Sequence, residues 1–185
     1  QFTVAGLAAA KGFYSSKGES LDKARGPLIT AALDKTSLAY SLNGKANAGA
    51  QFDTCGAGGC YGHGYQSYYG AGNNSSQQTA SGAWNQLAGT GKTVNDTSLQ
   101  GYLRWLQNAY SYTTNIRPDS WPPAYFYYLW SSSKAYNIIQ GSGVPLAAGN
   151  IGPDSMGTLP AVSGREVNRN PAVDTRPPAR GAGAA

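Results

Sequence analysis

The stretch that decides the fold is TSLQGYLRWLQNAYSYTTNIRPDSWPPAYFYYLWSSSKAYNIIQG, residues 97–141. Its first part carries large side chains at helical spacing: Leu99, Leu103, Leu106 and Tyr110. Either Asp96 or Thr97 can cap the start of this helix, because a short side chain with an oxygen atom accepts a hydrogen bond from a backbone N–H of the first helical turn. The pattern breaks at residues 115–118, which predicts a turn between two helices.

The second helix of this stretch is expected to begin at Pro122 and Pro123, since proline is tolerated in a first helical turn. Aromatic and aliphatic side chains then occupy nearly every position. A helix that is apolar all round is normally buried on all sides. We therefore expect its rings to point inward, with Tyr125, Tyr128 and Trp130 as candidates for lining a cavity.

Two helices are predicted before this pair. Residues 2–16 form the first. The second is expected from about Leu21 or Pro27 to Leu42, with Gly44 as its stop, because glycine commonly ends helices.

A short helix carrying Trp84 is expected at residues 83–87. Residues 2–42 and 83–141 would then be two divergent copies of one helical hairpin. Together they predict an all-α domain over residues 1–142.

Residues 43–82 form a long segment rich in glycine, asparagine and tyrosine, with no helical pattern. Cys55 and Cys60 flank a glycine-filled loop that lets their sulfurs approach, which favours a disulfide and an exported protein over free thiols. The alternative is zinc, since Asp53, Cys55, Cys60 and His63 offer ligand types that this ion accepts. With the disulfide, His63 is expected to be a polar surface residue, and no metal or other cofactor is expected.

Candidate binding residues gather in the same segment and the helix after it: Tyr61, His63, Tyr65, Tyr68, Tyr69 and Trp84. Such rings offer flat faces that stack on a sugar ring or on a partner surface. The alternative is that they cover the core of the protein itself.

Composition argues against two classes of function. Only 12% of the residues are charged, and the net charge of +5 forms no dense basic stripe on a predicted helix, so nucleic-acid binding is not favoured. No run of 18 apolar residues predicts a membrane span. Asp96 and Asp119 flank helix starts, where carboxylates favour the helix dipole, so a capping role is expected rather than a catalytic one.

Prolines mixed with glycine and arginine predict that residues 143–185 are an extended segment lying on a surface or on a partner. The chain begins with Gln1 rather than Met, which suggests a processed chain or a piece of a longer one. Two hairpins are too few to close a ring of helix pairs. We therefore expect other protein chains, or the remainder of the same chain, to complete it.

The string GYLRWLQ at residues 101–107 is similar to the first half of the Gln-Trp repeat of squalene and oxidosqualene cyclases. Tyr102, Leu103 and Gln107 match that repeat in type and spacing.

Residues 83–178 also resemble uncharacterised exported bacterial proteins with squalene-cyclase-like or prenyltransferase-like repeats, through YYLWSSSKAY at residues 127–136. The resemblance implies an α/α toroid, with inner helices ringed by outer ones. It does not imply the activity, because the Asp-x-Asp-Asp acid of the cyclases is absent. Asp53 and Cys55 match the zinc pair of prenyltransferases, but His63 follows Cys55 much too closely.

The sequence thus predicts a secreted or periplasmic protein that serves as a structural or binding component of a larger extracellular or envelope assembly, without catalysis of its own. Its expected partners are protein chains or a glycan. Two alternatives stay open: a toroid enzyme acting on an isoprenoid or a polysaccharide, and a zinc-binding module.

Overall fold

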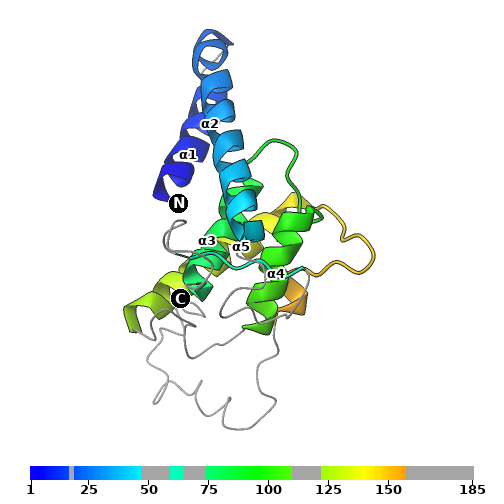
Figure 1. Ribbon diagram of the computed structural model, residues 1–185. Coiled ribbons are helices and arrows are strands. Elements are labelled where there is room, and N and C mark those ends of the chain that lie inside the picture. The colour runs from blue at the N-terminus through cyan, green and yellow to red at the C-terminus, as the bar shows by residue number, and fades with distance from the viewer. Residues whose placement is uncertain (17–18, 47–58, 65–73, 110–121, 157–185) are drawn as a thin grey trace, which may run out of the picture.

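The computed structural model describes residues 1–16, 19–46, 59–64, 74–109 and 122–156 (Figure 1). This part of the chain contains helices and no β-strand, which confirms the all-α prediction. The elements are α1 (Phe2–Ser16), α2 (Glu19–Ala46), α3 (Ser76–Leu87), α4 (Thr97–Asn108), α5 (Pro122–Ser142) and a short 3-10 turn, η2 (Pro153–Ser155). No helix in these ranges is both long and apolar enough to cross a membrane.

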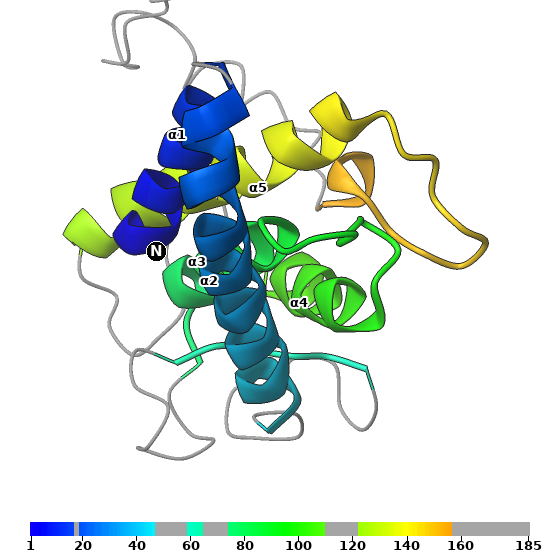
Figure 2. The same ribbon diagram turned by 90° about the horizontal axis from the view of Figure 1, so that it is seen from above.

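Helix α3 is the centre of the fold. It packs against α2, α4 and α5, while α1 lies along α2. In Figure 1 the hairpin of α1 and α2 projects from the body formed by the other helices, and Figure 2 shows α2 passing over α3. The two helices expected at residues 97–141 pack mainly on α3 rather than on each other, unlike the helices of a simple hairpin.

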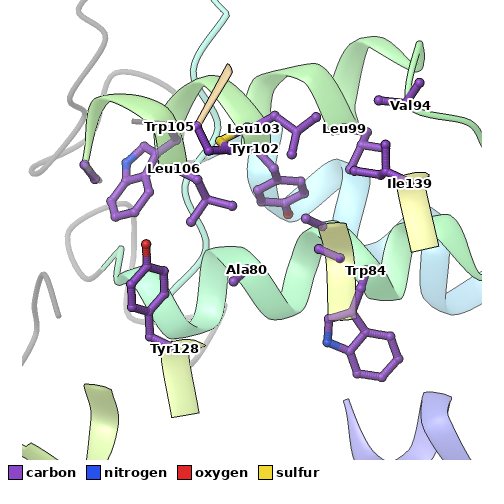
Figure 3. Packing of buried hydrophobic residues seen from close by; sticks show 14 of the residues in the cluster. Ala80, Trp84, Val94, Leu99, Tyr102, Leu103, Trp105, Leu106, Tyr128 and Ile139 are labelled. Carbon is purple, nitrogen blue, oxygen red and sulfur yellow. The ribbon is translucent and has the colours of Figure 1, made fainter. Parts of the chain in front are cut away.

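The core lies where α4 meets α3 and α5 (Figure 3). Its buried side chains from α4 are Leu99, Tyr102, Leu103, Trp105 and Leu106. The same cluster contains Ala80 and Trp84 from α3 and Tyr128 and Ile139 from α5, and in Figure 3 the Trp84 ring points to the side of α3 away from α4. The apolar face predicted from the spacing is therefore confirmed at Leu99, Leu103 and Leu106, whereas Tyr110 lies outside the described residues. Each large side chain buried here contributes roughly 1.5–3 kcal/mol to folding.

Only one side of α5 is buried. Tyr128, Ala135 and Ile139 point into the core, whereas Phe126 and Trp130 remain exposed. The prediction that this helix is buried on all sides is therefore wrong. Because α3 is the main helix that packs on it, one stripe of α5 is covered and the opposite rings face solvent.

Helix α3 begins at Ser76, well before the expected short helix at residues 83–87. Ser75 caps it, since its Oγ accepts a hydrogen bond from the Gln78 N–H at 3.3 Å. Nearly all of its polar side chains are buried: Ser76, Gln77, Thr79, Ser81, Asn85 and Gln86. The last residues of the predicted glycine-rich loop, 76–82, therefore belong to a buried helix.

Helix α2 continues through Pro27 and past Gly44, so the prediction that Gly44 stops it is wrong. Gly44 is instead a packing position for the ring of Tyr102, whose Oη donates to the Tyr40 carbonyl oxygen at 2.6 Å. A Cβ on Gly44 would lie 2.6 Å from the Tyr102 Cζ. The close approach of this buried ring requires glycine.

Replacing Gly44 with alanine is expected to lower the free energy of unfolding by about 1–3 kcal/mol, because the added Cβ overlaps the fixed Tyr102 ring. In an open helix the same replacement stabilises by up to about 1 kcal/mol. Gly12→Ala in α1 is the matched control, since no atom lies within 4 Å of its added Cβ. Denaturant unfolding should move the two variants in opposite directions, and a stabilised Gly44→Ala would contradict this packing.

The described residues that follow α5 are fastened to α4 by amide side chains. Gln100 Nε2 donates to the Ile151 carbonyl oxygen at 2.9 Å, and its Oε1 accepts from the Ile151 N–H at 2.9 Å. Gln107 Nε2 donates to the Ser155 carbonyl oxygen at 2.6 Å. Asn95 adds a donation to the Pro145 carbonyl oxygen at 2.9 Å. Residues 143–156 of the expected extended segment thus lie against the helical body, and the remainder lies outside the described residues.

Candidate functional site

Three exposed aromatic side chains lie together where α5 begins and α1 starts. We call Phe2, Phe126 and Trp130 the aromatic surface; they are 73%, 69% and 39% exposed. The ring centroids of Phe2 and Trp130 are 6.0 Å apart. Phe126 and Trp130 are one helical turn apart and therefore neighbours on α5.

Side chains around Trp130 fix its position. Tyr127 stacks on it at a centroid distance of 6.3 Å, and the buried Trp84 meets it edge-on at 6.4 Å. The Lys134 ammonium lies 4.8 Å from the centroid of the same ring, a cation–π contact. The Trp130 ring, which forms part of the aromatic surface, is therefore fixed in position by its neighbours.

The start of α1 is held beside α5 by a buried polar group. Ser81 Oγ and Ser131 Oγ lie 3.0 Å apart, and both donate to Gln1 Oε1. Ser81 comes from α3 and Ser131 from α5, so three helices meet at this point. These hydrogen bonds place Phe2 against Trp130.

His63 is half-buried beside two rings rather than exposed, which corrects the expectation of a polar surface residue. Its ring centroid lies 4.8 Å from that of Tyr40 and 6.4 Å from that of Tyr102. Burial lowers its pKa to about 4, and the nearby Gly64 carbonyl only partly opposes this shift. The ring is therefore neutral at pH 7. Its Nδ1 donates to the Gly64 carbonyl oxygen at 2.6 Å.

The other candidate binding residues occupy different surroundings. Tyr61 lies over Gly101 of α4, and its N–H donates to the Gly101 carbonyl oxygen at 2.9 Å. Trp84 is buried against α5. Tyr61 and His63 therefore pack on helices of the protein itself. Tyr65, Tyr68 and Tyr69 lie outside the described residues, and a binding role for the set stays a prediction.

The cysteine segment is described only in part. Cys60 is buried, and the described residues contain no free cysteine. Cys55 and Asp53 lie outside the described residues, so the disulfide and the zinc alternative both stay predictions. Among the residues that the structure describes, no three His, Cys, Asp or Glu side chains form a group able to hold a metal.

The candidate cavity-lining residues do not share one surface. Tyr128 is buried and points toward α4, as Figure 3 shows, whereas Trp130 belongs to the exposed aromatic surface. The side chain of Tyr125 lies outside the described residues.

Two carboxylates hold turns. Asp34 accepts from the Thr90 N–H at 2.6 Å and from its hydroxyl, and these bonds lower the pKa of Asp34. Asp96 stands at the start of α4, but its carboxylate accepts from the Lys92 Nζ and the Thr93 N–H instead of from the helix. Asp96 thus occupies the expected cap position without making the expected cap hydrogen bond.

Sequence reasoning did not single out Phe2 or Phe126. The spacing of α5 gave no signal for Phe126, because large apolar side chains surround that helix on all faces. Comparisons with protein family models, with curated proteins and with solved structures find no match.

Proposed function

We propose that this chain is an exported binding component of a larger extracellular or envelope assembly, and that it contacts another protein chain through the aromatic surface. The observation that carries the proposal is the exposure of Phe2, Phe126 and Trp130 side by side. Contiguous apolar groups of this kind mark interaction surfaces, and aromatic side chains are enriched where proteins meet.

A protein partner suits this surface better than a glycan does. Sugar binding needs an aromatic face that is free for stacking, but Tyr127 and Lys134 already contact the ring of Trp130. Phe2 and Phe126 are exposed over most of their surface, and such groups fill apolar pockets of a partner.

The α/α toroid and the export are parts of the same proposal. In a toroid, the uncovered rings of α5 would meet the next helices of the ring, which another chain or a further part of this one would supply. A Cys55–Cys60 disulfide would suit an oxidising compartment, and the buried Cys60 without a free thiol supports it. The enzyme alternative has less support, since Asp34 and Asp96 are engaged in holding turns.

Photo-crosslinking tests the surface directly. A benzoyl-phenylalanine at position 126 keeps the phenyl ring in place and should give one adduct of defined mass when the protein is irradiated in its producing cells. Position 140 is the matched control, because Gln140 is also exposed on α5 but lies about 21 Å further along the helix. Equal adducts at both positions, or none at position 126, would contradict the proposal.

A further inference from the structure

The outer side of α1 carries an exposed apolar row. We call Phe2, Gly6, Ala9 and Phe13 the α1 seam; all four are exposed, and Phe13 is 54% exposed. A Cβ added to Gly6 would meet no atom within 4 Å. The other side of the helix packs inward through Val4. Figures 1 and 2 show α1 at the outer edge of the molecule.

The spacing of the α1 seam is that of a coiled-coil face. Its residues are separated by four, three and four positions, which keeps them at the a and d sites of successive heptads. The order of side chains is also symmetric, with a large ring at each end and a small residue at each inner position. The row therefore has the same form in both directions along the helix.

We propose that the α1 seam pairs with the α1 seam of a second copy of this chain, antiparallel and about a two-fold axis. In this pairing Phe2 lies opposite Phe13 of the second copy, and Gly6 lies opposite its Ala9. The small inner residues let the two helices approach closely, while the rings close the interface at both ends. A surface that matches itself is what a two-fold dimer requires.

Charge does not oppose contact between two copies at the α1 seam itself. The chain has a net charge of +5, so two copies repel each other wherever charged surfaces meet. The α1 seam contains no ionisable side chain. Antiparallel helices further place the positive end of each helix dipole beside the negative end of the other.

The α1 seam is continuous with the aromatic surface, because Phe2 belongs to both and contacts Trp130. The inference thus rests on the proposed function and names its partner as another copy of the chain. Phe126 and Trp130 then lie at the rim of the same interface.

Sedimentation velocity with Ala9→Glu tests the pairing. A carboxylate at position 9 would be buried without a partner at the centre of the interface, so association should weaken by more than about tenfold. Ala8→Glu is the matched control, because Ala8 is exposed on the same helix but lies away from the α1 seam. We expect the unmodified protein and Ala8→Glu at twice the 19.3 kDa mass of the chain, and Ala9→Glu at 19.3 kDa.

A monomeric unmodified protein would overturn the dimer, as would two variants that behave alike. Circular dichroism of both variants checks that α1 still folds. Crosslinking at position 126 separates this inference from the proposed function. An adduct to a different protein, with a monomer in solution, would refute the dimer and leave the proposed function standing. An adduct of two copies supports both.

Discussion

Replacing Trp105 with alanine is expected to lower the free energy of unfolding by about 3–5 kcal/mol. Trp105 has no exposed surface and lies in the core where α4 faces α3 and α5. Its loss removes buried apolar area and leaves a cavity that the surrounding helices fill only in part. Since a typical domain is stable by about 5–15 kcal/mol, a large share of stability is lost. Thermal and denaturant unfolding measure the change.

Phe126→Ala is the control for this variant. It also removes an aromatic ring, but from a side chain that is mostly exposed, so the expected loss is below about 1 kcal/mol. If both variants unfolded at the same denaturant concentration, the placement of Trp105 in the core would be wrong.

Lowering the pH from 7 toward 4 is expected to destabilise the protein by up to about 3 kcal/mol through His63 alone. Burial lowers the pKa of His63 to about 4, whereas a histidine in the unfolded chain has its ordinary pKa of 6.5. Between these values the unfolded chain binds the proton and the folded chain does not. The contribution of neutral His63 to the free energy of unfolding is therefore fully present above about pH 6.5 and is lost as the pH falls toward 4.

His63→Gln isolates this effect, since glutamine does not titrate. Its unfolding free energy should change less between pH 7 and pH 4 than that of the unmodified protein, whatever its absolute stability. NMR titration of the His63 ring gives the pKa directly. A value near 6.5 would show that the ring is open to solvent and would refute its burial beside Tyr40 and Tyr102.

The helices with strong local signals could be predicted from the sequence. The apolar row of residues 99–106 predicted α4, and the two prolines at residues 122–123 predicted the start of α5. The end of α2 could not be predicted, because the glycine at position 44 is required by the packing of the distant Tyr102 ring and does not mark a helix end. Helix α3 was mostly missed, since its buried side chains are polar and lack an apolar period.

The candidate site could not be predicted from the sequence, because the exposure of its side chains depends on tertiary packing. In α5 the residue types are apolar on every face, so the sequence cannot distinguish the buried Tyr128 from the exposed Phe126. That difference depends on where α3 lies. The spacing of the α1 seam is visible in the sequence. Only the observed exposure of Phe2 and Phe13 shows that this side of α1 faces outward.

The contact between Gln1 and Ser131 has a consequence for how the molecule reaches its final form. These residues are separated by 130 positions, so their hydrogen bond forms only after most of the described chain has left the ribosome. Pairings this distant in sequence form slowly, because a long loop must close before any contact compensates for the lost chain entropy. Helices α1 and α2 are thus synthesised early, but Phe2 can pack against Trp130 only after α5 has been synthesised.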